Sequence, residues 1–482
     1  MIRAVLVDVL GFLSVAILVY YLLVNGIYLL VYSSSLLELR TSLREDRWEP
    51  AYSRFSSPFL PEVAIVVPAY NEAPIIADSV QALLDLNYSA KEIIVVNDGS
   101  TDDTLDVLTA TFDLEKTAAP VPIDTNSERV RAVYRAPRIE ELTVIDKVNG
   151  GKGDALNAGV WLSDAPLVCA LDADSLIDRE GLLKAVKPFL RDPTRMVATG
   201  GTVRVANGCE IDDSQVTAVT TADSFLPGVQ EMEYLRAFYA GRLGYSRLEG
   251  LILISGAFGL FRTDLVREIG GYNPGSVTED FELVVRLHRH LTERNIPYSV
   301  DFVPEPVVWT QAPGTWGALA RQRRRWFRGL IDTLVRERDM IGNPRYGRPG
   351  LFAMPAYVLT EVLGPLIEGF GYVLIPLAIA LGALDAGFFL LFLAVTMGFG
   401  VLLSWFGVLV EVWGFRRYTE PTDVLVLLAH GVFENMGFRQ WKAFVAWHGL
   451  LEYVRGDSEW GEMTRQRFTA SEDAATRTDE AD

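Results

Sequence analysis

Long apolar segments constrain this chain most, because few folds can accommodate them. Residues 5–32 are almost entirely apolar, and two similar segments cover 354–381 and 387–412. A helix needs about 20 apolar residues to cross a bilayer, so each segment is long enough. A cleaved signal peptide is the alternative for the first segment, but its apolar part has only about 7 to 15 residues. We therefore expect a retained membrane anchor at 5–32.

A fourth apolar region, 424–454, is interrupted by the polar or charged residues Glu434, Asn435, Arg439, Gln440 and Lys442. Each apolar half is short for a span of its own. The pattern predicts a broken, re-entrant or interfacial pair of helices, and a single span with a polar centre is the alternative.

Arginines next to the apolar segments predict the orientation of the chain. They are Arg40, Arg44, Arg47 and Arg54 after the first segment, and Arg416 and Arg417 after the third. Positive residues beside membrane spans stay in the cytoplasm. We therefore expect a multi-pass protein of the cell (inner or plasma) membrane with residues 55–350 in the cytoplasm. The only cysteines, Cys169 and Cys209, fit a reducing compartment, and the net charge of -18 argues against nucleic-acid binding.

The region after residue 60 alternates short apolar runs with helical patterns. Strands are predicted at 63–67 and 92–96, and helices at 73–86 and 101–111. This alternation predicts an α/β fold with a mostly parallel sheet and helices on both faces. Ligands bind beyond the carboxyl ends of such strands, where the polar clusters 69–72 and 97–100 lie, although ordinary turns explain either cluster alone. The poorly patterned segment 114–142 is interpreted as a surface excursion.

A glycine-rich stretch, 150–159, contains Lys152 and leads into a predicted helix. Glycines allow close backbone approach to a ligand, and a helix start favours an anion. The spacing of a P-loop is missing, and a tight turn before a helix explains the stretch equally well.

An apolar strand at 167–171 ends in Asp172 and Asp174. Alternation along a strand predicts that both carboxylates point to the same side. Mg2+ or Mn2+, shared with substrate phosphates, is the natural cation between them, and a solvated turn is the alternative.

Acidic residues also begin a helix predicted to run to about Leu291. Ser276 and Glu279 have the spacing of a capping box, which leaves Asp280 free to act as a general base. His288 and His290, further along this helix, are expected at the surface.

The run 322–326 reads Gln-Arg-Arg-Arg-Trp. On a helix, Gln322, Arg325 and Trp326 share one face, whereas Arg323 and Arg324 point elsewhere, towards lipid headgroups. The alternative is an amphipathic interfacial helix with a basic face, supported by Trp316, Leu319, Phe327 and Leu330.

Together these motifs resemble the processive family 2 glycosyltransferases, the membrane-embedded synthases of hyaluronan, chitin, cellulose and poly-N-acetylglucosamine. The resemblance covers about residues 60–335 and the flanking spans. Five short motifs occur in the family's order, and the last is spelled most like that of chitin synthases. The motifs are Pro68-Ala69-Tyr70-Asn71-Glu72, Asn97-Asp98-Gly99-Ser100, Asp172-Ala173-Asp174, Thr278-Glu279-Asp280 and Gln322-Arg323-Arg324-Arg325-Trp326.

The resemblance implies a GT-A domain and roles for the matching residues. Tyr70, Glu72 and Asp98, with Ala69 beside them, would hold the uridine of a UDP-sugar donor. Lys152 would bind UDP, Asp172 and Asp174 would engage the diphosphate and a Mg2+ or Mn2+ ion, and Asp280, with Glu279 beside it, would deprotonate the acceptor. Gln322, Arg325 and Trp326 would contact the diphosphate and the acceptor sugar.

Departures from the family limit the prediction. A Phe-x-Val-Thr-x-Lys gating loop and a C-terminal regulatory domain are not recognisable, which argues against a cellulose synthase. Three or four membrane segments make a self-contained secretion channel doubtful, so a homodimer or an export partner is the alternative. N-acetylglucosamine is favoured as the donor sugar on resemblance alone.

The predicted function is a membrane-bound inverting transferase that extends a β-linked polysaccharide. The alternatives are a non-processive enzyme that makes a glycolipid, and an inactive membrane scaffold or nucleotide sensor. The expected partners are the donor, a growing glycan or lipid acceptor and membrane lipids. The expected domains are an anchor and linker at 1–54, a catalytic domain at 55–312, interfacial helices at 313–350, a transmembrane or re-entrant region at 351–458 and a disordered acidic tail at 459–482.

Overall fold

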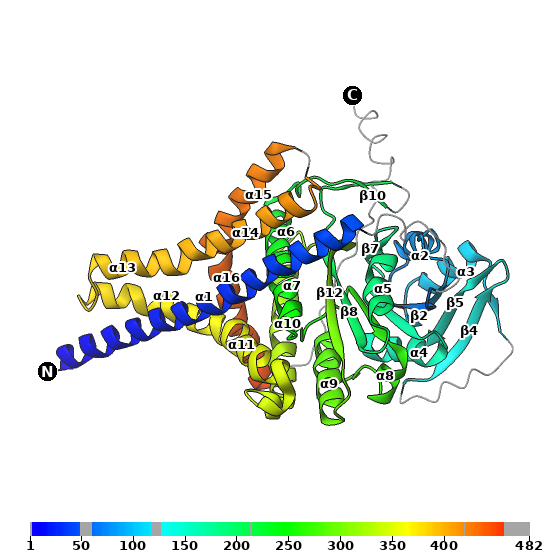
Figure 1. Ribbon diagram of the computed structural model, residues 1–482, viewed down its shortest axis with the longest axis horizontal. Helices are drawn as coiled ribbons and strands as arrows, with labels where there is room; N and C mark the ends of the chain where they lie inside the picture. The colour runs from blue at the N-terminus through cyan, green and yellow to red at the C-terminus, as the bar shows by residue number, and fades with distance from the viewer. Residues whose placement is uncertain (1, 49–59, 118–126, 213–214, 419, 457–482) are drawn as a thin grey trace.

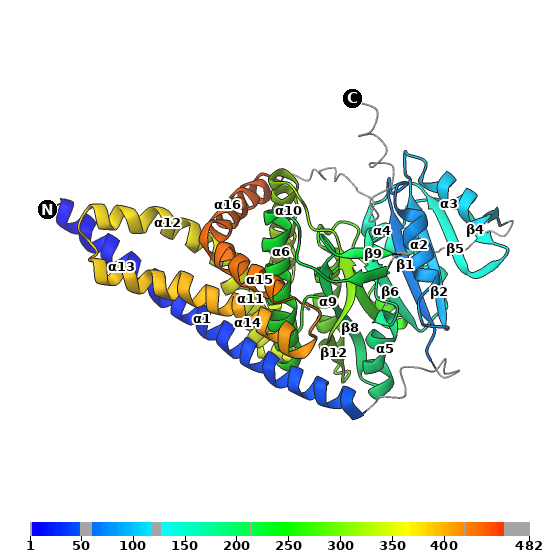
Figure 2. The same cartoon turned by 90° about the horizontal axis from the view of Figure 1, so that it is seen from above.

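The computed structural model describes residues 2–48, 60–117, 127–212, 215–418 and 420–456. An α/β body lies on one side, and long apolar helices extend away from it on the other (Figures 1 and 2). The predicted tail at 459–482 and Arg54 lie outside the described residues.

The described residues form one ten-stranded sheet in the order β3-β4-β5-β2-β1-β6-β11-β8-β12-β7, and a separate hairpin of β9 and β10. The strands are β1 (Val63–Ala69), β2 (Lys91–Asp98), β3 (Glu115–Lys116), β4 (Val130–Ala136), β5 (Ile139–Lys147), β6 (Leu167–Leu171), β7 (Ser175–Ile177), β8 (Met196–Val205), β9 (Glu210–Asp212), β10 (Gln215–Ala218), β11 (Phe258–Arg262) and β12 (Ser299–Thr310).

The helices of the body are α2 (Ile76–Leu84), α3 (Thr104–Phe112), α4 (Lys152–Leu162), α5 (Gly181–Arg191), α8 (Thr263–Glu268) and α9 (Glu279–Glu293). Between body and apolar helices lie α6 (Phe225–Leu235), α7 (Leu243–Arg247) and α10 (Trp316–Arg336). A π-helical segment, Arg236–Arg242, joins α6 to α7.

The centre of the sheet confirms the predicted parallel strands. β5, β2, β1 and β6 are mutually parallel, with Ala69 opposite Asn97 and Asp98 opposite Lys147. Their apolar runs are buried because helices cover both faces. The carboxyl ends of these strands therefore meet at one edge, where the polar clusters lie.

Outside the centre the prediction of a mostly parallel sheet is wrong, since β8 and β12 are the only parallel neighbours among the described strands there. β11 runs antiparallel to β6 and β8, and β4 runs antiparallel to β5, so the sheet is mixed. The segment 114–142 is also not an excursion, because β3, β4 and part of β5 occupy its described residues. Strands near a sheet edge bury only some of their side chains, which weakens the apolar pattern in the sequence.

Within the described residues, three helical stretches are long and apolar enough to cross a membrane, namely Val5–Arg44, Pro349–Ala380 and Ala386–Gly414. The first belongs to α1 (Ile2–Trp48); the others contain α11 (Met354–Tyr357), α12 (Gly364–Ala380), α13 (Ala386–Leu393) and α14 (Phe399–Gly414). The start of α1 and the α12–α13 turn lie together at the end remote from the body (Figure 1).

The predicted break in the fourth apolar region is confirmed. α15 (Pro421–Phe433) and α16 (Arg439–Arg455) are separated by a kink at Met436 and Gly437, where the backbone is not helical. α16 packs against α10 through Ala446, which contacts Phe327 and Ile331. The region after the kink is thus joined to the helix that carries the Gln-Arg-Arg-Arg-Trp run.

Candidate active site

The loops after β1 and β2 are tied to each other by hydrogen bonds. The backbone N–H of Asn71 donates to Ser100 Oγ at 3.0 Å, and its side-chain oxygen accepts from the N–H of Thr101 at 2.8 Å. The Tyr70 side chain is exposed, whereas Glu72 is buried. Tyr70 and Glu72, the predicted uridine ligands, therefore lie in a loop that is hydrogen-bonded to the neighbouring loop at the sheet edge.

Asp98, predicted as a uridine ligand, also contacts a buried lysine and the glycine-rich loop. Its carboxylate lies 2.6 Å from Lys147 Nζ and accepts hydrogen bonds from the N–H groups of Gly150 and Gly151 at 3.0 and 2.8 Å. Lys147 is fully buried and also pairs with Asp154. Asp98 thus fixes the glycine-rich loop in place, beside any contact it makes with uridine.

Sequence reasoning missed Lys147 and Asp154 because neither stands in a recognised motif. A lysine at the last position of a buried strand, five residues before Lys152, was the available signal. A buried lysine needs carboxylate partners, and Asp98 and Asp154 lie on either side of it in the sequence.

Lys152 gathers the acidic residues of the site around one ammonium group. Its Nζ lies 2.6 Å from Asp172 Oδ1 and 2.9 Å from Glu279 Oε1, although these residues come from different elements. Burial alone lowers the pKa of Lys152, but the surrounding carboxylates outweigh burial, so this pKa lies above its usual value. Lys152 therefore stays charged, as a group that binds phosphate must.

Asp172 and Asp174 lie in a turn, so the argument from alternation along a strand is wrong. β6 ends at Leu171, and the N–H of Ser175 donates to the Asp172 carbonyl at 3.0 Å. Both aspartates are nevertheless partly exposed while Ala173 between them is buried. The turn, rather than the pleat of a strand, leaves both carboxylates accessible.

The donor set of this turn fits a hard divalent cation that is shared with a diphosphate. The described residues contain no cluster of three or more potential metal-binding side chains, so the protein offers few ligands of its own. Mg2+ in nucleotide sites takes one or two carboxylates and completes its shell with phosphates and water. Asp172 and Asp174 can supply these one or two carboxylate ligands.

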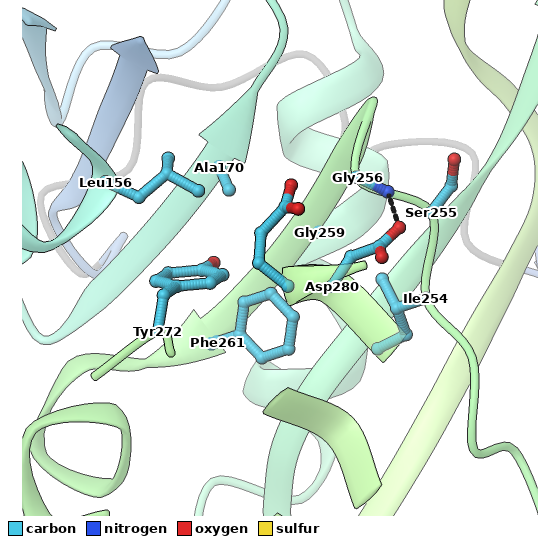
Figure 3. Close-up of a pocket in the computed structure, with 10 residues that line it drawn as sticks. Leu156, Ala170, Ile254, Ser255, Gly256, Gly259, Phe261, Tyr272 and Asp280 are labelled. Carbon is cyan, nitrogen blue, oxygen red and sulfur yellow. Dashed lines mark hydrogen bonds between the residues drawn. The ribbon is translucent and has the colours of Figure 1, made fainter. Parts of the chain in front are cut away.

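Asp280 is held beside a small cavity of about 10 Å³, which is about the size of one water molecule (Figure 3). Its Oδ2 accepts from the N–H of Gly256 at 2.6 Å, and its Oδ1 from the N–H of Phe281 at 2.8 Å. A Cβ at Gly256 would lie 3.0 Å from both Asp280 Oδ2 and Lys152 Nζ, so a glycine suits this close approach. The absence of a side chain at Gly256 therefore leaves room for both the Asp280 carboxylate and the Lys152 ammonium group beside its backbone.

Desolvation raises the pKa of Asp280 to about 6, with a further contribution from the Glu279 carboxylate and an opposing one from Lys152. A carboxylate with this pKa is ionised at neutral pH and accepts a proton more readily than an exposed aspartate.

The predicted capping box at this helix is wrong. α9 begins at Glu279 with Thr278 as its cap, and the Thr278 side chain makes no capping hydrogen bond. The Glu279 carboxylate turns to Lys152 instead, because an ion pair with a buried ammonium outweighs a neutral cap.

His288 is buried, so its predicted surface position is also wrong. Its ring nitrogens contact Tyr298 Oη at 2.8 Å and the Leu251 carbonyl at 2.9 Å. His290 is partly exposed and lies 3.4 Å from Glu268. Position 288 lies on the same face of α9 as the buried residues Val284, Leu287 and Leu291.

α10 reaches the site by packing directly against Thr278. A Cβ at Gly329 would lie 2.4 Å from the Thr278 side chain, so only a glycine permits this approach. Arg325 and Trp326 lie one helical turn before Gly329, on the same side of the helix. The motif is therefore brought next to Thr278-Glu279-Asp280, and Gly329 is a site residue that the sequence reasoning missed.

Arg323 and Arg324 are not free for lipid headgroups, contrary to expectation. Arg323 Nη2 lies 2.7 Å from Glu233 Oε2, and Arg324 Nε lies 2.9 Å from Glu452 Oε1. Both arginines face protein because α6 and α16 flank α10, an arrangement that the local sequence does not reveal.

Residues 61–329, more than half of the chain, match the family model described as Glycosyltransferase like family 2. The chain belongs to glycosyltransferase family 2. As a family 2 glycosyltransferase it has a GT-A fold, here with a mixed sheet whose central strands carry the polar clusters.

Two relatives of this family 2 enzyme are the poly-beta-1,6-N-acetyl-D-glucosamine synthases of Staphylococcus epidermidis and Staphylococcus aureus (strain COL). Each is 26% identical over 276 residues, which is 57% of this chain. The chain spans 56% of the length of these relatives. One similar solved structure is the mannosyltransferase of Pyrobaculum calidifontis in complex with GDP-Man and Mn2+. The match covers 86% of this chain and 99% of the mannosyltransferase chain, with a TM-score of 0.49 and 18% sequence identity.

Proposed function

We propose that this family 2 glycosyltransferase transfers sugar from a UDP-sugar, with UDP-N-acetylglucosamine as the favoured donor, onto a growing β-linked polysaccharide. The donor assignment is supported by the relatives that are named poly-beta-1,6-N-acetyl-D-glucosamine synthases. A growing glycan is the favoured acceptor, and a lipid acceptor is the alternative.

One observation carries the proposal. Lys152 joins Asp172 to Glu279, Asp280 lies against the same Gly256 backbone, and α10 packs on Thr278 through Gly329. These contacts support a phosphate-binding role for Lys152 next to Asp280 as a candidate base, with the helix that carries Trp326 packed against Thr278. An inverting transfer needs this combination, with a base on one side and a stabilised leaving group on the other.

In the proposed reaction, the acceptor hydroxyl oxygen attacks the anomeric carbon of the donor. Asp280 takes the hydroxyl proton, the bond from the anomeric carbon to the diphosphate breaks, and UDP leaves with the electron pair. Lys152 and Arg325 balance the charge on the departing diphosphate, and Tyr70, Glu72 and Asp98 lie at the uridine end. Gln322 and Trp326 contact the acceptor sugar in this account, since an indole face suits a pyranose ring.

A divalent cation at Asp172 and Asp174 would neutralise charge on the diphosphate when bound. We predict that EDTA abolishes transfer and that Mg2+ or Mn2+ restores it, as measured by UDP release from purified protein. Full activity in EDTA would remove the role assigned to Asp172 and Asp174.

We also propose a location at the cell membrane, with the catalytic domain at its cytoplasmic face. Three membrane-length helices and the arginines at their ends support this topology. The domain division proposed above follows from it: 1–54, 55–312, 313–350, 351–458 and 459–482. A second copy or an export partner is the proposed route for polymer release.

A donor screen tests the proposal directly. Purified protein with Mg2+ is offered UDP-N-acetylglucosamine, UDP-glucose and UDP-glucuronate, and UDP release is measured with Asp280→Asn as the inactive reference. We expect turnover with UDP-N-acetylglucosamine that the variant lacks. Absence of turnover with every donor would refute the transferase function, and preference for another donor would refute the sugar assignment.

A further inference from the structure

We propose that Glu233 is a positioning residue for the acceptor site, because it fixes Arg323 against the ring of Trp326 and links that pair to Lys442 on α16. This inference rests on the proposed function, in which Trp326 contacts the acceptor sugar. It adds two residues, one of them in the C-terminal helical region, to the set that prepares the site.

Glu233 is the carboxylate at which three distant elements meet. It lies on α6, with its Oε2 2.7 Å from Arg323 Nη2 on α10 and its Oε1 2.6 Å from Lys442 Nζ on α16. The Glu233 side chain is 10% exposed, so both contacts are largely shielded from water. Each carboxylate oxygen thus has its own cation, which fixes the orientation of the group.

Electrostatics keeps this contact intact over the working pH range. Burial raises the pKa of Glu233, but Arg323 and Lys442 outweigh burial and lower it to about 2. The ionised carboxylate therefore holds the Arg323 guanidinium in place under all conditions of assay.

The arginine that Glu233 holds lies over the tryptophan of the motif. The guanidinium carbon of Arg323 is 4.4 Å from the centroid of the Trp326 ring, and Trp326 remains 37% exposed. A cation against one face of an indole restrains the ring plane and leaves the rest of the ring for a sugar. Since the contact is 4.4 Å, a shift of Arg323 changes the orientation of Trp326.

α6 and its continuation hold both sides of the kink between α15 and α16. Arg236 Nη2 lies 2.6 Å from Glu434 before the kink, and Glu233 binds Lys442 after it. Lys442 also lies over the Phe438 ring at 5.8 Å. The position of α16 therefore affects Trp326 through two ion pairs, from Lys442 to Glu233 and from Glu233 to Arg323.

The alternative is that the ion pairs of Glu233 stabilise the fold and do not affect acceptor binding. A second buried ion pair in the chain provides a matched control. Arg204 on β8 pairs with Glu411 on α14 at 2.7 Å, and these side chains are 2% and 0% exposed. This pair also joins the body to an apolar helix. Glu411→Gln therefore removes a comparable buried ion pair without removing a contact to Arg323.

The experiment uses full-length protein in detergent with UDP-N-acetylglucosamine as donor and an N-acetylglucosamine pentasaccharide as acceptor. Transfer gives the acceptor KM, and donor hydrolysis without acceptor reports on the donor site. For Glu233→Gln we expect the acceptor KM to rise about tenfold while the donor KM stays within about twofold of wild type. Lys442→Met should raise the acceptor KM less, since Arg323 keeps its carboxylate.

Arg323→Lys serves as a second variant, because it keeps the charge next to Glu233 but loses the planar group over the ring. It should also raise the acceptor KM. An unchanged acceptor KM in both Glu233→Gln and Arg323→Lys, or an equal rise in Glu411→Gln, would overturn the inference while leaving the proposed function intact. Wild-type protein that neither transfers nor hydrolyses any UDP-sugar would instead overturn the proposed function, and the inference with it.

Discussion

The carboxylate of Asp280 combines a fixed position with a raised proton affinity. Two backbone N–H groups hold its oxygens, while desolvation and Glu279 bring its pKa to about 6. Lys152 opposes this rise without reversing it. The group is therefore ionised at neutral pH and still able to accept a proton, as a general base should be.

The base assignment predicts a defined pH dependence. Below pH 6 the protonated Asp280 can no longer accept the hydroxyl proton, so kcat/KM should fall about tenfold for each pH unit. Asp280→Asn should lower kcat by about 100- to 10,000-fold and remove this acidic limb. Both are measured by UDP release between pH 4.5 and 8.5. Full turnover in the variant would exclude Asp280 as the base.

At the scale of elements, the approach of α10 to α9 decides where the Gln-Arg-Arg-Arg-Trp run lies. Gly329 permits this approach, since its absent Cβ leaves room for Thr278. Ion pairs from Arg323 to α6 and from Arg324 to α16 then fix the rotation of α10 about its axis. The helix is thus held by contacts on several sides before a substrate arrives.

A methyl group at position 329 should therefore separate α10 from the site. Gly329→Ala places Cβ 2.4 Å from Thr278, and overpacking of this kind costs about 1–3 kcal/mol. We expect a strong loss of transfer with a modest drop in Tm. Gly317→Ala is the control on the same helix, because its Cβ would meet only Arg321 at 3.7 Å. Equal activity in the two variants would contradict the proposed packing.

The sequence predicted those elements whose signals are local. The central strands, the apolar helices and the kink after Phe433 follow from runs of neighbouring residues, and the structure has them. The partners of Arg323 could not be predicted, because their contacts join residues far apart in the chain: Glu233 lies 90 positions from Arg323. The capping box failed for a similar reason, since Lys152 competes for Glu279. The site roles stay predictions until variants are assayed.

At the scale of the whole molecule, the start of α1 and the α12–α13 turn lie together, remote from the α/β body (Figure 2). Arg40 and Arg44 in the last turns of α1, and Arg416 and Arg417 after α14, belong to the opposite ends of these helices. This arrangement is consistent with the proposed topology, in which α1, α12 and α14 cross the membrane and the body lies at the cytoplasmic face.

Introduced cysteines test that topology. Cys169 and Cys209 are first replaced, and single cysteines are then placed at Ala383 in the α12–α13 turn and at Glu115, which is exposed on the body. A membrane-impermeant maleimide should label position 383 in intact cells and position 115 only after lysis. Labelling of position 115 in intact cells would reverse the proposed orientation.

The size of the product tests the central claim, that this enzyme polymerises sugar from a UDP-sugar. Purified protein in lipid is given radiolabelled UDP-N-acetylglucosamine and Mg2+, and products are separated by size before and after lipid extraction. The account predicts label in long chains that form early while most acceptors remain unextended, with none formed by Asp280→Asn. A lipid that carries a single sugar as the only product, or no labelled product at all, would contradict it.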